Sequence, residues 1–115
     1  MTATTSTRNL AARFAGPVLA GRGLPGLARA GADVLGDPVA FFDRSGIVLA
    51  VAGATQDQES RLTEGGKGVT SIELALGDEV VGEVRYIGEG ADAETLDVFA
   101  AFAALEVERA RSAEW

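Results

Sequence analysis

The stretch DPVAFFDRSGIVLAVAG, from Asp37 to Gly53, contains two apolar runs separated by the four residues Asp43 to Gly46. A four-residue connection that ends in glycine suits a type I turn followed by a left-handed glycine, so the stretch predicts a tight β-hairpin. Val39 to Phe42 and Ile47 to Ala52 are apolar at every position instead of alternating with polar residues. Because a strand with one wet face alternates, we expect both faces of this hairpin to be covered.

Composition limits the classes of function open to this chain. It has 115 residues, 47% of them hydrophobic, which is enough for one domain with a buried core. The formal net charge is -7, with 17 acidic against 10 basic residues, and this opposes direct contact with nucleic acid. The sequence contains no cysteine and no histidine. This excludes disulfides, thiol nucleophiles, the usual zinc sites and imidazole acid/base catalysis, and it leaves carboxylates and hydroxyls. We expect no metal, no cofactor, no catalytic residues and no enzymatic activity.

The N-terminal residues do not read as a targeting segment. The stretch MTATTSTRNLAARF lacks the long apolar core of a signal peptide. No run in the sequence approaches the roughly 18 apolar residues that a membrane span requires. We therefore expect a cytoplasmic protein without membrane contact.

Two helices are expected before the hairpin. A short first helix should start at Ser6 or Thr7, and Gly16-Pro17 should end it. Its apolar anchors are Leu10 and Phe14. The stretch GLPGLARAGADVLGDP then predicts a second helix that leads straight into the hairpin.

The stretch GATQDQESRLTEGGKG, residues 53–68, follows the hairpin and is polar and charged. It predicts a loop or lid with at most one helical turn, around Asp57 to Leu62. Its GGKG segment faintly resembles a phosphate-binding loop, but the Walker spacing and the following serine or threonine are missing. A flexible turn is therefore the favoured interpretation of that segment.

A second hairpin is expected in VTSIELALGDEVVGEVRYIGEG, where apolar and polar residues alternate. If Gly77-Asp78-Glu79 forms a three-residue turn, the apolar residues of both strands share one face of the hairpin. That register places Leu76, Leu74 and Ile72 opposite Val80, Gly82 and Val84. The polar residues then share the other face, and they are Ser71, Glu73, Glu83 and Arg85.

The last stretch, ADAETLDVFAAFAALEVERARSAEW, predicts the longest helix, with Asp92 as its N-cap. One apolar stripe consists of Leu96, Phe99, Ala103, Val107 and Ala110. A second stripe, roughly opposite, consists of Val98, Phe102 and Leu105. The second stripe needs its own partner, either the N-terminal helix or the same helix of a second copy. Glu106 and Glu108 point to different faces, which excludes an acid/base pair between them.

Together these patterns predict an α+β fold in the order α-α-β-β-loop-β-β-α. Two hairpins form a small antiparallel sheet, and the N- and C-terminal helices pack on one of its faces. We expect residues 1–21 to form an N-terminal helix and link, and residues 22–115 to form one domain.

The sequence also resembles a known family. The runs GRGLPGLARAGADVLGDPVAFFDRSGIVLA, VVGEVRYIGE and FAAFAALEVERARSAEW resemble the GAF-like sensory domain of PucR/CdaR-type bacterial transcriptional regulators. The resemblance covers roughly residues 22–115. It implies a GAF/PAS-like fold and a sensory domain that leads towards a C-terminal helix-turn-helix module. The helical pattern reaches Trp115 without a glycine or proline stop, which agrees with such a continuation.

The polar sheet face is the candidate ligand site. Ser71, Glu73, Glu83 and Arg85 could line it, with Arg85 meeting an anionic group of the ligand and residues 53–68 acting as a lid. The favoured alternative is a solvated face with an exposed pair between Glu73 and Arg85, in which Arg85→Ala changes stability by well under about 1 kcal/mol.

Two apolar features also allow two interpretations. Phe41 and Phe42 could stack on a planar ligand, but aromatic residues in a strand are usually core. Val98, Phe102 and Leu105 predict a homodimer interface, because a contiguous apolar ridge on a small protein is usually covered.

Three functions remain. The favoured one is a regulatory sensory and dimerisation domain of a bacterial transcriptional regulator that senses a small metabolite. The alternative is a ligand-free dimerisation module of the same fold. An enzyme is the weakest, because nothing supplies a nucleophile beside a base.

Overall fold

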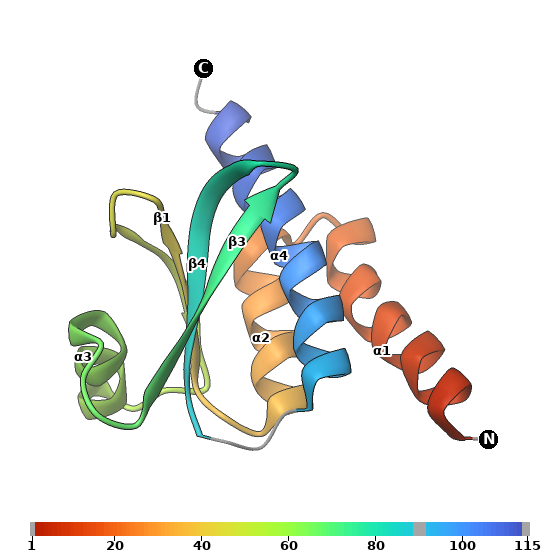
Figure 1. Cartoon of the computed structure of the whole chain (residues 1–115), viewed down its shortest axis with the longest axis horizontal. Helices are drawn as coiled ribbons and strands as arrows, with labels where there is room; N and C mark the ends of the chain where they lie inside the picture. The colour runs from red at the N-terminus through yellow and green to blue at the C-terminus, as the bar shows by residue number, and fades with distance from the viewer. Residues whose placement is uncertain (1, 89–91, 114–115) are drawn as a thin grey trace.

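A four-stranded antiparallel sheet in the order β2-β1-β4-β3 occupies the middle of the computed structural model (Figure 1). The structure describes residues 2–88 and 92–113, and their side chains from residue 11 to residue 112. The strands are β1 (Val39–Asp43), β2 (Val48–Ala52), β3 (Val69–Leu76) and β4 (Glu79–Ile87). The helices are α1 (Thr2–Leu19), α2 (Gly23–Leu35), α3 (Gln56–Glu64) and α4 (Ala93–Ala113).

The helices form layers on both sides of this sheet (Figure 1). α2 and α4 pack on one face, here called the inner face, and α1 packs on α2 and α4 on the side away from the sheet. α3 packs on the opposite face, here called the outer face, and contacts β1 and β4. The predicted α+β class is confirmed, including the antiparallel sheet of two hairpins and the terminal helices on one face.

The turn of the first hairpin is confirmed. Gly46 has a φ of 85°, and its N–H donates to the carbonyl of Asp43 over 3.0 Å. The Asp43 carboxylate accepts hydrogen bonds from the backbone N–H groups of Ser45 and Ile47, at 2.8 and 2.9 Å. The aspartate therefore fixes the turn that the sequence predicts, as short polar side chains do in Asx turns.

Covering of both faces is confirmed for β1, where Val39 to Phe42 are all buried. Val39 and Phe41 belong to the main core on the inner face, and Ala40 and Phe42 form a second cluster with Leu62 of α3. For the start of β2 the prediction is wrong, because Ile47 and Val48 are 62% and 45% exposed. β2 is an edge strand, and α3 covers only the other end of the outer face.

Three phenylalanines hold the main core together. The ring of Phe99 on α4 lies 5.0 Å from that of Phe14 on α1 and 5.5 Å from that of Phe41 on β1, between ring centroids. α2 approaches this ring through Gly31, where a Cβ would collide with the Phe99 ring. A residue without a side chain is therefore needed at this crossing.

The expectation of a loop at residues 53–68 is wrong, because α3 covers nine of them. Thr55 is its N-cap: the hydroxyl accepts from the N–H of Gln58, and the Gln58 side chain accepts from the N–H of Thr55. Gly65 ends the helix in a left-handed conformation. The reciprocal cap and the C-terminal glycine define a full helix where the polar composition indicated a loop.

The expected short first helix is also wrong at both ends. α1 begins at Thr2 and continues through Pro17 to Leu19. Pro17 lies in the last turn, so the hydrogen bond that it removes is one of the final ones of the helix. Phe14 is buried as expected, whereas the side chain of Leu10 lies outside the described residues.

The second hairpin has the predicted register over most of its length. Ile72 pairs with Val84 and Leu74 with Gly82, as expected, but a bulge after Leu74 then shifts the pairing. Leu76 therefore pairs with Glu79 and not with Val80, so the connection contains Gly77 and Asp78 alone. The expected register left one extra residue in a three-residue turn. In the structure the turn has two residues, and the extra residue lies in the bulge of β4 instead.

Candidate functional site

The four residues predicted to line a ligand site lie together on the outer face. Ser71 pairs with Arg85 and Glu73 with Glu83 across β3 and β4, so the predicted polar face is confirmed. Ser71 and Glu73 are exposed, whereas Glu83 and Arg85 are partly buried. The structure thus brings the four together but gives them unequal access to solvent.

Glu83 is the centre of the polar contacts. Its carboxylate accepts hydrogen bonds from Arg85 Nε at 3.0 Å and Arg85 Nη2 at 3.2 Å, and from the Ser71 hydroxyl. The hydrogen bonds from Arg85 and then from Ser71 hold the pKa of Glu83 below its ordinary value, against a smaller opposing effect of burial. The ion pair on this face is therefore Arg85 with Glu83, and not the expected pair of Arg85 with Glu73.

Arg85 also binds the end of α3. Its Nη1 donates to the carbonyl oxygens of Leu62 and Thr63, at 2.8 and 2.7 Å. The guanidinium lies over the ring of Phe42, 4.4 Å from the centroid, and the side chain is 18% exposed. Arg85 therefore satisfies carbonyls at the C-terminus of α3, where a positive charge also suits the helix dipole.

Beyond α3 the outer face is open and hollowed. A hollow of about 370 Å³ there is lined by Ser71, Glu73 and Glu83 of the predicted site, and Arg85 is not part of it. Asp43, Arg44, Val80 and Gly82 complete its wall. Since the Arg85 guanidinium is turned towards α3 and Glu83, the remaining residues give this hollow a mainly acidic wall.

The predicted dimer ridge on α4 is partly covered within the chain. Phe102 packs against Phe14 of α1, with their ring centroids 6.3 Å apart. Val98 and Phe102 are partly buried, whereas Leu105 is 57% exposed. The N-terminal helix thus takes up part of the role that a second copy was expected to play.

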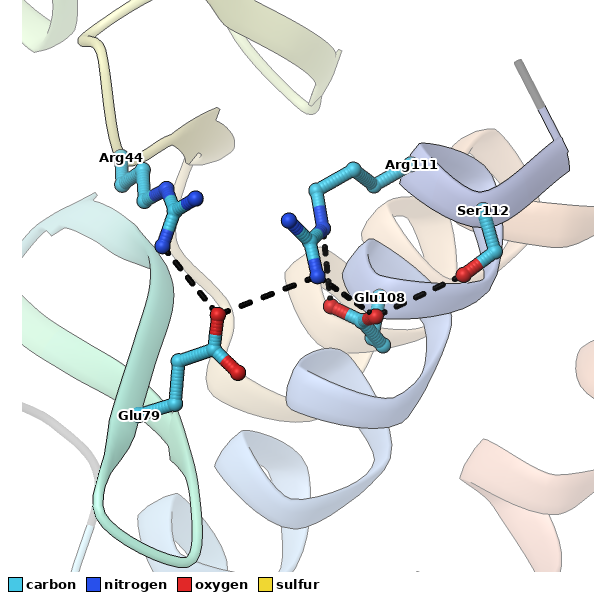
Figure 2. A network of polar contacts seen from close by, with 5 residues as sticks. All are labelled: Arg44, Glu79, Glu108, Arg111 and Ser112. Carbon is cyan, nitrogen blue, oxygen red and sulfur yellow. Dashed lines mark hydrogen bonds and ion pairs between the residues drawn. The ribbon is translucent and has the colours of Figure 1, made fainter. Parts of the chain in front are cut away.

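A network of charges joins α4 to the two hairpin turns (Figure 2). Glu79, at the start of β4, lies between Arg44 of the first turn, at 3.2 Å, and Arg111 of α4, at 3.8 Å. Arg111 in turn pairs with Glu108 over 2.8 Å. The hydrogen bonds between Glu108 and Arg111 lower the pKa of Glu108 and raise that of Arg111.

Sequence analysis missed both the network and the role of Arg85. The pairing of Arg111 with Glu108, three residues apart on one helix, was visible in the sequence. The contacts of Arg44 and Arg111 with Glu79 were not, because they depend on how three separate elements end at the same side of the molecule.

The described residues were also compared with the requirements of a metal site and of a membrane-spanning helix. Among residues 2–88 and 92–113, no group of three or more Asp or Glu residues is placed to hold a metal ion. None of the helices, over their described residues, has the length and apolar character needed to cross a membrane. Comparison of the sequence with models of known protein families and with curated proteins found no match.

Proposed function

We propose that this chain is a regulatory sensory and dimerisation domain of a cytoplasmic bacterial transcriptional regulator. The family resemblance noted in the sequence supports the proposal, and so does the arrangement of α4. The observation that carries it is the network of Arg44, Glu79, Arg111 and Glu108, which connects both hairpin turns to the last turns of α4 (Figure 2).

This network offers a route from the sheet to the C-terminal helix. A ligand that moves either hairpin turn changes the contacts of Glu79, and Glu79 contacts α4 only through Arg111 within the network. An exposed ion pair of this kind is weak, so small movements can break and remake it. A change in the sheet is thereby passed to the position of α4, which is what a regulatory domain requires of its output helix.

The sensory part of the proposal is tested by ligand screening. Thermal unfolding of the 115-residue chain is measured with purines, sugar acids and amino acids at increasing concentration. A ligand that binds only the folded state raises the Tm in a saturable manner, so one class should do so. If no class raises the Tm, the sensory proposal is overturned.

The dimerisation part rests on the exposed flank of α4, where Leu105 is exposed and lies two helical turns from the partly buried Val98 of the same stripe. Sedimentation equilibrium is measured for the native chain and for Leu105→Glu. We expect a native dimer and a monomeric variant, because a carboxylate buried without a partner is costly. Phe102→Glu is a poorer probe, since Phe102 also packs on Phe14. A native chain that stays monomeric at high micromolar concentration contradicts the proposal.

A second candidate is a ligand-free association module, and the open half of the outer face favours it. Ile47, Val48 and Val80 are large apolar residues that are all exposed near the hairpin turns. Val80→Glu is therefore the matched partner of Leu105→Glu. If the native chain is a dimer that Val80→Glu dissociates while Leu105→Glu does not, and no ligand class raises the Tm, the second candidate replaces the first.

A further inference from the structure

A hollow of about 390 Å³ lies where the turn between α1 and α2, strand β2 and helix α4 meet. Its size is within the range of small-molecule sites. Leu24 of α2 and Leu49 of β2 give it apolar walls, Gly21 and Gly23 form its backbone side, and Glu106 and Arg109 of α4 supply opposite charges. It is separate from the polar hollow on the outer face of the sheet.

Glu106 is the unusual member of this set. It is 6% exposed, yet its only partner among the described residues is Arg109, whose Nη1 lies 3.6 Å from Glu106 Oε2. The Arg109 side chain itself is 67% exposed. Its carboxylate accepts no hydrogen bond from the described residues, and neither of its oxygens is both fully buried and unpaired. The carboxylate therefore stays accessible from the hollow and can accept a hydrogen bond from a charged donor there.

Positive charge reaches the hollow from two places, the start of α2 across from α4 and Arg109 beside Glu106. α2 begins at Gly23 without a side-chain cap and without an acidic residue in its first turn. Gly21 and Gly23 have φ values of 74° and 62°, which favour glycine and leave the backbone open to a ligand. The first N–H groups of a helix carry partial positive charge and bind carboxylates. Arg109 adds a full charge to the same hollow.

We propose that this hollow binds a small zwitterion of the α-amino-acid type with an aliphatic side chain. The ammonium group donates to Glu106, the carboxylate binds Arg109 and the start of α2, and the side chain lies against Leu24 and Leu49. An amine alone leaves Arg109 and the helix terminus unmatched, and an anion alone places a second negative charge beside Glu106. The proposal deepens the sensory function above and rests on it.

The position of the hollow explains how occupancy would reach α4. Glu106 and Arg109 flank the buried Val107 and precede Arg111, the residue that joins α4 to the hairpin turns. Bound ligand would therefore link the start of α2 to the same helical turns of α4 that carry the network.

Binding is tested by calorimetry on the full chain with L-leucine, with 3-methylbutylamine, which lacks the carboxylate, and with 4-methylpentanoate, which lacks the amine. We expect leucine to bind at least about tenfold more tightly than either analogue, since each charge-assisted contact is lost separately. L-Alanine, L-valine and L-methionine report the fit of the apolar walls. Equal binding of leucine and one analogue, or no binding of any amino acid, overturns the inference.

Two variants and one control locate the site. Glu106→Gln and Arg109→Ala should each weaken leucine binding at least about tenfold, because each removes one charged contact. Arg109→Ala also removes the ion-pair partner of Glu106, so urea unfolding of this variant is measured beside its leucine affinity. Asp97→Asn, an exposed carboxylate near the other end of α4, should leave the affinity unchanged. If leucine binds and neither variant weakens it, the site is elsewhere. If only purines or sugar acids raise the Tm, this inference fails while the sensory function stands.

Discussion

The two faces of the sheet are buried by different means. On the inner face, two helices cover β1 and β4 with apolar side chains, and Phe41 lies in the same cluster as Phe14 and Phe99. On the outer face, one nine-residue helix contributes a single buried side chain, Leu62. The neighbouring residues Phe41 and Phe42 are 0% and 1% exposed, so burial alone does not distinguish the two faces.

The difference lies in what holds each layer in place. The free energy of apolar contact is non-directional and grows with the buried area. The inner face is therefore sensitive to any loss of side-chain volume, but it does not depend on any single bond. The outer layer has little area and depends on directed bonds from Arg85 to the last carbonyls of α3. We therefore expect inner-face substitutions to act on the whole fold and outer-face substitutions to act mainly on α3.

The largest effects should come from the adjacent phenylalanines. Phe41→Ala should lower the free energy of unfolding by about 3 to 5 kcal/mol, because it leaves a cavity in the main core. Phe42→Ala should cost about 3 kcal/mol, the lower end of that range, since water enters more easily from the open half of the outer face. Urea unfolding measures both. A greater loss for Phe42→Ala would contradict the contrast between the faces.

Gly82→Val tests how closely the backbones of β1 and β4 approach each other beneath α4. A Cβ at residue 82 would collide with the backbone oxygen of Phe42 and lie 3.4 Å from Val107 Cγ1. Overpacking of this kind should cost about 1 to 3 kcal/mol in urea unfolding. Gly77→Val, at the β3–β4 turn, is the comparison variant. Nothing lies within 4 Å of the added Cβ there, but φ is 62°, so any loss of stability comes from backbone strain and not from overpacking. Unchanged stability of Gly82→Val would show that the register is wrong.

Arg85→Ala tests the directed bonds of the outer layer. It should cost about 2 to 3 kcal/mol, because two carbonyls and Glu83 lose a charged donor in a partly buried position. This exceeds the small effect expected for a solvated face. Arg85→Lys keeps the charge without the planar fork and should recover only part of the loss. Proteolysis within residues 56–64 should accelerate in both variants. An unaltered rate of cleavage would contradict the claim that Arg85 holds α3 in place.

The pH dependence of stability provides a smaller test. The folded pKa of Glu83 is lowered below the ordinary value of 4.5 by hydrogen bonds from Arg85 and Ser71. Its contribution is therefore complete above about pH 4.5 and is lost as the pH falls through the folded pKa. The stability difference between the native chain and Glu83→Gln should be constant near neutral pH and shrink in acid. Glu73→Gln, directly across the strand pair, is the control.

The smallest effect should be that of Arg111→Ala, because the ion pairs of the network in Figure 2 are largely exposed. Its effect on Tm should be smaller than that of Arg85→Ala and should decrease further as salt screens the charges. Arg85→Ala should change little with salt, since its bonds are partly buried. If both variants show the same salt dependence, the contrast between the exposed ion pairs of Arg111 and the partly buried bonds of Arg85 is contradicted.

Much of the inner face could be predicted from sequence, because its signals are local. The unbroken apolar run of β1 and the Asp43 to Gly46 turn define a hairpin covered on both sides, and the structure confirms this for β1. The outer face depends on pairs distant in sequence: the carbonyls that Arg85 binds lie 22 and 23 residues before it. That role cannot be inferred without knowing that α3 is a helix and where it docks.

α3 itself was predictable in part. Its capping box, Thr55 with Gln58, is a local sequence signal, and the left-handed Gly65 marks its end. The prediction of a loop rested on the polar composition of the segment and made no use of these signals. For α1, a proline was expected to end the helix. Pro17 lies in the last turn, however, and the helix continues for two residues beyond it.

The bonds from Arg85 to α3 also order events in time. An isolated helix of nine residues is marginal in water, so α3 gains little from forming alone. Its stabilising donor is on β4, which must first pair with both β1 and β3 before Arg85 is in place. α3 should therefore consolidate after the transition state of folding, with φ-values near zero at its residues, and its amide hydrogens should exchange through local opening long before those of β1.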